Sequence, residues 1–334
     1  MGTVHAEING IIIHCNDSVL GINIGAGYTL EKRYLTDISY KNKITDGDGR
    51  LTLSYIGSQL KDDNGVYFIC LNKVEDYSVT PPNIRPGICL TDRDIMCEDQ
   101  IIAYKQNQMQ YLHKIFSLIH LFKAGNIGFV QLFFEQKYTA MGFITNTMHQ
   151  TDNSVTKNIV DERVFSLTTD EITACNAFLT DYIDTYDIIK DNIDEFIWGL
   201  EQVDVPTGFE QFTTALEMTM LAKGQRNKKE ALAKRVSVLL ETDPAKRLTL
   251  YNKMKDFYRY RSESLHEGNG QNITSSELLE LEEVVRRILV KYLEYCKNEM
   301  LLKPTATWEE IKDKKINEMI SVVQTAIAAN ELPQ

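Results

Sequence analysis

The chain has 334 residues, of which 43% are hydrophobic and 25% are charged, and its formal net charge is −11. This length predicts two or three domains, and the composition excludes a disordered chain, a fibrous repeat and a small disulfide-stabilised peptide. The negative net charge argues against nucleic-acid binding by the whole surface, although it leaves room for a local basic face.

The sequence carries no sign of a membrane, a secretory route or a metal site. No apolar run approaches the ~18 residues that span a bilayer. The first residues include His5 and Glu7 but no basic segment and no small-residue cleavage site. Six scattered cysteines without a CxxC pair predict reduced, buried thiols. We therefore expect a cytoplasmic protein with no membrane partner, no metal and no cofactor.

Residues 1–150 have the pattern of a mixed, mostly β domain. Short apolar runs broken by Gly, Asp and Asn predict strands at 11–13, 19–24, 51–55 and 128–143, and helical spacing covers 106–123. Prolines 81, 82 and 86 indicate an extended loop. We expect this domain to serve in sensing or recruitment.

Asp46-Gly47-Asp48-Gly49 predicts a tight hairpin turn. A calcium loop with Gly49 as its sixth residue would need carboxylates first and twelfth, where the chain has Ile44 and Tyr55.

Beyond a polar linker at 146–161, the chain has a helical pattern. Thr168 and Glu171 form a Thr-x-x-Glu capping box, which opens a helix. Caps, glycine stops and apolar spacing predict further helices over 206–224, 228–241, 243–268, 274–296 and 307–329. The sequence thus predicts an α+β protein with a mostly β domain at 1–150, an acidic linker and helix at 151–205, and an antiparallel helical bundle at 206–334.

Acidic and basic residues are segregated in the second half. Residues 151–204 hold thirteen Asp/Glu against three Lys/Arg, whereas residues 221–261 hold twelve Lys/Arg against four Asp/Glu. The basic segment ends in residues 257–268, Phe-Tyr-Arg-Tyr-Arg-Ser-Glu-Ser-Leu-His-Glu-Gly, which include the only histidine after residue 149. Cleaving RNA without a metal requires proton transfer at the 2′-OH and at the leaving 5′-oxygen, with positive charge on the phosphate. A histidine and an arginine can supply these roles.

This stretch resembles the HEPN superfamily, because Arg261 to His266 fits the Arg-x(4–6)-His signature. The likeness is closer to the Apea-like branch, whose Tyr-x-x-Arg-Ser-x-x-x-His block is matched by Tyr258, Arg261, Ser262 and His266. The resemblance covers about 206–298 and extends loosely to Leu-Phe-Lys-Ala-Gly at 121–125. The chain departs from the family by placing Glu267 between the histidine and the glycine.

The resemblance implies a HEPN-like helical domain that acts as a metal-independent endoribonuclease. His266 would be the general base or acid, Arg261 would hold the scissile phosphate, and Ser262 would orient the site. Glu267 and Asn269 are secondary candidates. The resemblance further implies a homodimer in which two motifs face one another, and a toxin or anti-phage defence effector with an antitoxin or other protein regulator.

A second arginine competes with Arg261, because Arg259 also fits the motif. At about 100° per residue, a continuous helix puts 259 and 266 on nearly the same face, whereas 261 and 266 converge only if the helix ends between them. The Arg-Ser pairing favours Arg261, which we take as the first candidate.

The basic and aromatic residues around the motif allow two interpretations, an RNA-binding role or a structural one. Lys228, Lys229 and Arg235 are candidates for tracking an RNA backbone, although such a run is also typical of a solvated helix face. Tyr260 could stack on a base, and Tyr258 fits core packing or the site. The alternative function is a non-catalytic module that binds RNA or a nucleotide, or a scaffold, with a HEPN-like fold.

Overall fold

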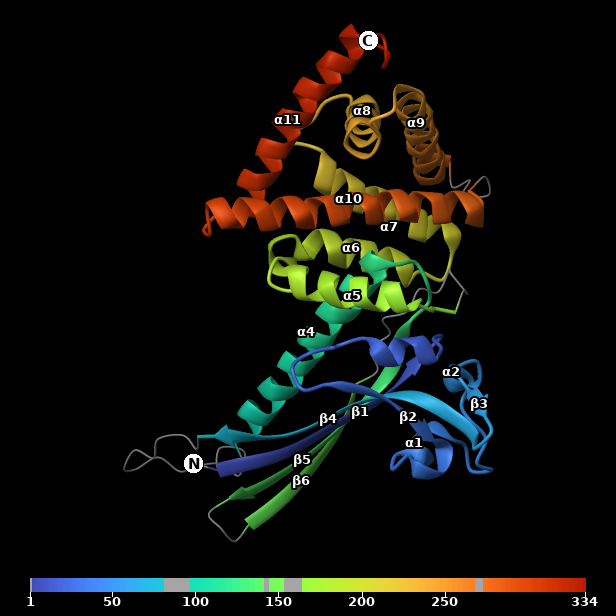
Figure 1. Ribbon diagram of the computed structural model, residues 1–334, viewed down its shortest axis with the longest axis vertical. Helices are drawn as coiled ribbons and strands as arrows, with labels where there is room; N and C mark the ends of the chain where they lie inside the picture. The colour runs from blue at the N-terminus through green and yellow to red at the C-terminus, as the bar shows by residue number, and fades with distance from the viewer. Residues whose placement is uncertain (1, 81–96, 141–143, 153–163, 268–272) are drawn as a thin grey trace. The chain divides into compact units, whose positions relative to one another are not determined.

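A computed structural model describes residues 2–80, 97–140, 144–152, 164–267 and 273–334 of the chain (Figure 1). It divides into two compact units. The sheet unit comprises the described parts of Met1–Phe116, Gly125–Lys157 and Glu162–Ala177, and the helical unit comprises Ser117–Ala124 and the described part of Phe178–Gln334. The protein is α+β, as predicted. The division falls inside α5 (Thr169–Tyr182), so the boundary expected at residue 150 lies within the sheet unit.

The sheet unit is built on one antiparallel sheet. Its order is β2-β4-β1-β5-β6, with β3 paired to β4. The strands are β1 (Gly2–Ile13), β2 (Thr29–Tyr34), β3 (Leu60–Asp62), β4 (Gly65–Val79), β5 (Gly128–Ala140) and β6 (Ile144–Asp152). The predicted strand at 128–143 corresponds to β5, and 11–13 is only the end of the much longer β1. Strand β6 occupies part of the segment expected to be a linker at 146–161.

Helix α4 (Glu98–Phe122) lies along one face of this sheet. The Tyr104 hydroxyl donates to Glu75 at 2.5 Å, and Lys73 donates to Gln108 at 3.1 Å. The Lys73 ammonium, although buried, is paired with Glu75 at 2.6 Å. A buried charge is tolerated only when it is paired, as this one is within β4. The bonds of Tyr104 and Gln108 to these two residues attach α4 to β4.

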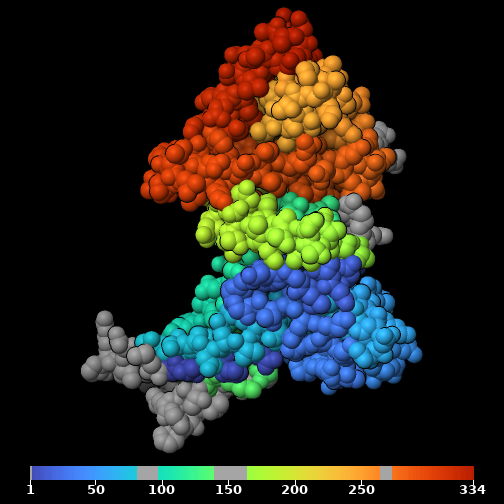
Figure 2. Space-filling view, viewed as in Figure 1, coloured from blue at the N-terminus to red at the C-terminus, as the bar shows by residue number. Residues whose placement is uncertain are grey.

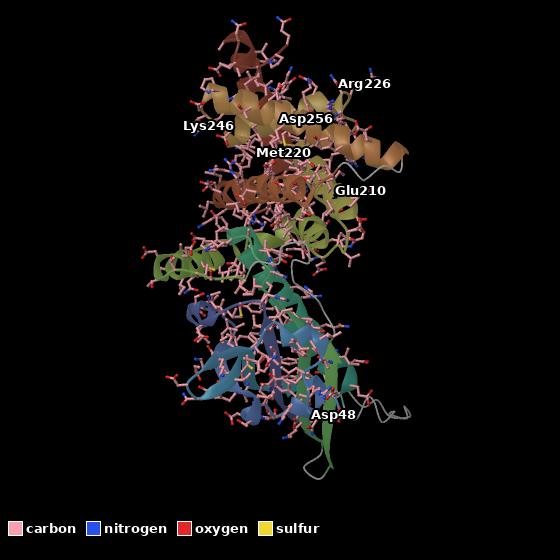
Figure 3. All side chains as sticks on the ribbon, turned by 90° about the vertical axis from the view of Figure 1, so that its right-hand side faces the viewer. Asp48, Glu210, Met220, Arg226, Lys246 and Asp256 are labelled. Carbon is pink, nitrogen blue, oxygen red and sulfur yellow. The ribbon has the colours of Figure 1, made fainter. Side chains whose placement is uncertain are left out.

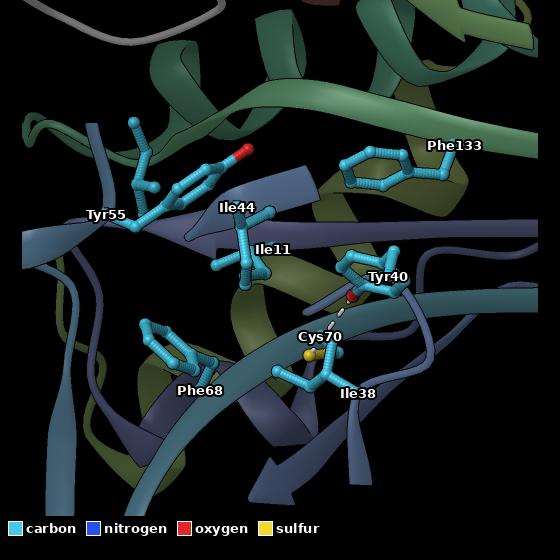
Figure 4. Packing of buried hydrophobic residues seen from close by; sticks show 9 residues of the cluster. Ile11, Ile38, Tyr40, Ile44, Tyr55, Phe68, Cys70 and Phe133 are labelled. Atoms are coloured by element: carbon cyan, nitrogen blue, oxygen red, sulfur yellow. Dashed lines mark hydrogen bonds between the residues drawn. The ribbon is translucent and has the colours of Figure 1, made fainter. Parts of the chain in front are cut away.

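The opposite face of the sheet is covered by residues 35–56, where a compact apolar cluster forms. Tyr40 stacks on Phe133 with ring centroids 4.4 Å apart, and its hydroxyl lies 3.6 Å from the sulfur of Cys70 (Figure 4). The buried cluster consists of Ile11, Ile13, Ile38, Tyr40, Ile44, Tyr55, Phe68, Cys70 and Phe133. The short elements over and beside it are η1 (Asp17–Gly21), η2 (Leu35–Asp37), α1 (Lys41–Ile44) and α2 (Leu53–Ile56).

Two predicted strands in this region are wrong. Residues 19–24 begin in η1, because the side chain of Asn16 accepts the amide of Ser18 and starts a 3₁₀ turn. Residues 51–55 enter α2, which buries Tyr55 and leaves Leu53 in solvent. The tight turn at 46–49 is present, since the carboxylate of Asp46 accepts the amides of Asp48 and Arg50 at 3.0 and 2.8 Å, but it joins α1 to α2 through the single bridge Thr45–Leu51 and not two strands.

The helical unit has α7 at its centre, in contact with α6, α8, α9, α10 and α11. Its elements are η3 (Tyr186–Ile188), α6 (Lys190–Leu200), α7 (Val205–Met220), α8 (Lys228–Leu240), α9 (Pro244–Glu267), α10 (Ser275–Leu302) and α11 (Trp308–Ala328). The capping boxes predicted at Thr168, Thr274 and Thr307 are all present. Helices α8 and α11 lie side by side on the surface of this unit (Figure 2). The sequence did not single out α6.

The described residues bear on three predictions, which concern the cysteines, a membrane-spanning helix and a metal site. Cys15, Cys70, Cys97, Cys175 and Cys296 are free and buried, and burial raises the pKa of Cys70 to about 11. Cys89 and the loop with prolines 81, 82 and 86 lie outside the described residues. Within the described parts, no helix combines the length and apolar character needed to cross a bilayer. The same parts hold no group of three or more His, Cys, Asp or Glu arranged for a metal ion.

Glu201, which caps the C-terminal end of α6, is expected to make stability depend on pH. Burial raises its pKa to about 7 from 4.5, so the folded chain keeps the proton between these values while the unfolded chain releases it. Stability should therefore fall as the pH rises from 4.5 to 7. Glu201→Gln should be more stable than wild type by about 2 kcal/mol at pH 8 and equal to it near pH 4. Urea unfolding at both pH values measures this, with Glu210→Gln as control.

Candidate functional site

Helix α9 contains both arginines and the histidine of the predicted site. It begins at Pro244, where Asp243 accepts the amide of Lys246 at 2.9 Å, and continues to Glu267. The helix thus extends through 261–266, as its predicted range implies, and the earlier end that Arg261 would need in order to meet His266 is absent. In a continuous helix, positions 259 and 266 lie about 20° apart around the axis, whereas 261 and 266 lie about 140° apart. The side chains of His266 and Glu267, and Asn269 as a whole, lie outside the described part of the structure.

Arg261 points from α9 toward α7. Its Nη1 donates to Oε1 of Glu217 at 2.7 Å, and the two side chains are 19% and 13% exposed. Its guanidinium carbon lies 5.9 Å from the centroid of the Tyr258 ring. Nε of Arg261 is buried and has no hydrogen-bond partner among the described residues. Arg261 is thus largely enclosed, with one donor unused.

Glu217 receives a second cation from α8. Lys228 Nζ lies 3.0 Å from Oε2, on the other oxygen of the same carboxylate. Tyr258 lies within the field of the same carboxylate, since burial followed by the charge of Glu217 raises the pKa of that phenol. We call Glu217, Lys228, Tyr258 and Arg261 the carboxylate cluster. It joins three helices through one anion.

Glu217 was missed by the sequence analysis. One signal was available, because Glu217 is the only acidic residue between 211 and 229 and directly follows Leu216 of the buried stripe of α7. Its partner Arg261 is 44 residues away. No periodic pattern reveals a contact at that separation.

Arg259 has a more open environment than Arg261. Its side chain is 51% exposed and pairs with Asp256 at 3.2 Å and with Glu263 at 3.7 Å. Such surface pairs contribute only about 0–1 kcal/mol, so a phosphate can replace these carboxylates at little cost. Ser262 is exposed and lies within about 60° of Arg259 around the helix. The exposed face of α9 therefore carries Arg259 and Ser262 in line with position 266.

Tyr260 is held against α10. The guanidinium carbon of the neighbouring residue Arg259 lies 5.2 Å from the centroid of the Tyr260 ring. A hydrogen bond to Glu277 is the largest cause of its raised pKa. Base stacking on Tyr260, as the sequence suggested, would compete with these contacts.

The predicted RNA-binding cations fall into two groups. Arg235 is buried and donates to the Met220 carbonyl and to Gln225, both at 2.8 Å, so it stabilises the turn between α7 and α8 instead of presenting charge to a surface phosphate. Lys223, Arg226 and Lys229 have no acidic partner among the described residues, and Arg226 projects from that turn (Figure 3). The available positive charge lies on the turn that precedes Lys228, at Lys223 and Arg226, and in the first turn of α8, at Lys229.

Comparison of the chain with protein-family models, with curated proteins and with solved structures found no match. The resemblance to the HEPN superfamily thus depends on the motif residues of α9, and function follows as a proposal from their geometry.

Proposed function

We propose that the helical unit is a metal-independent endoribonuclease that acts through the exposed face of α9. The observation that carries the proposal is the continuity of α9, which aligns positions 259, 262 and 266 along one face of the helix. His266 exchanges a proton with the reacting oxygens, and Arg259 neutralises the charge that builds on the phosphate. In this assignment Arg259 takes the role first given to Arg261, and Ser262 orients the site.

The reaction is an internal transesterification. His266 removes the proton of the 2′-OH, whose oxygen then bonds to phosphorus, and the bond from phosphorus to the 5′-oxygen breaks with a proton delivered to that oxygen. The products are a 2′,3′-cyclic phosphate and a 5′-OH. One imidazole serves one of these transfers at a time, so a second copy of the chain, facing the first, provides the other. The sheet unit serves recruitment or sensing in a cytoplasmic toxin or defence effector.

The proposal is tested with the full chain and a labelled single-stranded RNA in excess EDTA. We expect cleavage within the strand, and product ends that phosphatase cannot remove until acid opens the cyclic phosphate. Products bearing a 3′-OH, or loss of cutting in EDTA, would overturn it.

A non-catalytic RNA-binding module is the second candidate, favoured by the ion pairs that Arg259 and Arg261 already make. In that case the chain should retain RNA on a filter, with or without His266, and release no product. A scaffold would do neither, and charge reversal at Lys228 and Lys229 would then have no effect on RNA retention.

A further inference from the structure

The carboxylate cluster has the donor set of a phosphate site. A guanidinium at 2.7 Å and an ammonium at 3.0 Å approach different oxygens of Glu217, and the Tyr258 ring lies 5.9 Å from the guanidinium carbon of Arg261. Arginine, lysine and tyrosine are the side chains that commonly donate to the oxygens of a phosphodiester. An internal carboxylate therefore occupies a place where a phosphate would find the same two cationic donors, with a tyrosine beside them.

The charges in this cluster do not cancel. One carboxylate faces two cations, and Lys223 and Arg226 of the preceding turn and Lys229 of α8 have no acidic partner among the described residues. A purely structural ion pair needs no such excess. The local field therefore attracts a further anion toward Glu217.

The cluster is also accessible from one side. Arg261 and Glu217 are mostly enclosed, but Lys228 is 50% exposed and belongs to the first turn of α8. A nucleic-acid strand that reaches Lys228 can pair a phosphate with its ammonium, in place of Glu217, without unfolding a helix. The carboxylate of Glu217 would then turn toward solvent on the side of the cluster that Lys228 covers.

We propose that Glu217 occupies a phosphodiester subsite and inhibits RNA binding until a backbone phosphate displaces its carboxylate from Arg261 and Lys228. This inference rests on the proposed function, because the subsite would hold the RNA on the same helix, α9, that carries the proposed catalytic residues. The subsite lies around the helix from position 266, so it holds a phosphate next to the scissile one and not the scissile phosphate itself. Glu217 thereby sets a threshold that only a flexible polyanion with several phosphates overcomes.

Glu217→Gln tests the inference, because the amide removes the negative charge and keeps the shape. The probe is a fluorescein-labelled, single-stranded 2′-deoxyoligonucleotide, which has the phosphates but cannot be cleaved through a 2′-OH. Anisotropy titrations of the full chain should give about tenfold tighter binding for Glu217→Gln. The slope of log K against log salt should steepen by about one, since one more phosphate contact forms.

Glu210→Gln is the matched control. Glu210 lies on the same helix two turns earlier, is labelled in Figure 3, and has no ion pair among the described residues. Glu210→Gln makes the same change of charge outside the carboxylate cluster. The affinity of this variant for the probe should therefore stay within about twofold of wild type. Adding Arg261→Ala to Glu217→Gln should cancel the gain.

Affinity that is unchanged or weaker in a folded Glu217→Gln chain would overturn the inference. If this variant does not fold, Glu217→Asp decides instead, because it keeps the charge but withdraws it by one methylene; it should bind about threefold tighter, and no gain would be a refutation. The outcomes are separable from those of the proposed function. A chain that never cuts RNA but binds tighter as Glu217→Gln retains the subsite, and a chain that cuts in EDTA without that gain loses only the subsite.

Discussion

Replacing His266 with alanine is expected to lower RNA cleavage about 10³-fold, because general acid–base catalysis by one group contributes about 10² to 10⁴. The measurement is the single-turnover rate in EDTA with saturating chain. Binding of the 2′-deoxy probe should change less than twofold, since His266 is outside the carboxylate cluster. A rate that equals that of wild type would contradict the assignment.

The same assay separates the two arginines. Arg259→Ala should reduce the rate about 10²-fold at saturation, as expected for loss of one charge aimed at the transition state. Arg261→Ala should act mainly on the concentration needed for saturation, because its guanidinium faces α7. The reverse pattern would mean that Arg261 meets the histidine of another copy. Arg226→Ala serves as the control for general loss of positive charge.

The helices were predictable because their ends are encoded locally. Thr274 and Glu277 satisfy each other's backbone groups, and Asp204 accepts the amide of Thr207 at 2.9 Å, so each start is visible within four residues. The stripe of α7, with Phe209, Phe212, Leu216 and Met220, is buried as its spacing predicts.

The strands were harder, because their extent is set by pairing partners. β1 continues through Glu7 and Asn9, two polar residues that interrupt its apolar pattern. The side chain of Asn9 is satisfied across the strand pair, since it donates to Glu7 and accepts from Asn72, both at 2.8 Å. From the sequence alone, a polar residue within a strand indicates a turn, because the hydrogen-bond partner that satisfies it is not visible. Alternation over five residues, as at 51–55, is too short to distinguish a strand from a helical turn.

The sequence motif names candidate residues for the proposed site, but it does not give their geometry. The motif identifies Arg259, Arg261 and His266, and the choice between the arginines depended on whether the helix ended before His266. The sequence Ser-Glu-Ser-Leu at 262–265 contains no helix breaker, and the glycine stop comes only at 268. The carboxylates that pair with Arg259 lie on α9 itself, whereas the partner of Arg261 lies on α7, 44 residues away. Only the fold therefore distinguishes an enclosed Arg261 from an exposed Arg259.

A buried ion pair in the helical unit also has a large expected effect. Arg286 and Glu282 form this pair on α10, with side chains 6% and 2% exposed. Arg286 further donates Nε to the carbonyl of His120 at 2.8 Å, pairs with Glu283, and lies 5.8 Å from the ring centroid of Phe196. It thereby joins α10 to the end of α4 and to α6. Burying two charges costs desolvation free energy, which their mutual attraction offsets. Removing one side chain alone leaves the desolvation of the other charge uncompensated.

Arg286→Met is expected to destabilise the chain by about 3 kcal/mol, because it leaves the buried Glu282 without its guanidinium. Urea unfolding followed by circular dichroism at 222 nm measures the loss. The double change Glu282→Leu with Arg286→Met should lose less than the single change, since it removes the buried charge together with its partner. Arg287→Met is the control on the same helix, where an exposed pair with Glu241 at 3.0 Å is worth under about 1 kcal/mol. Equal losses for Arg286→Met and Arg287→Met would show that burial of the pair has no energetic weight.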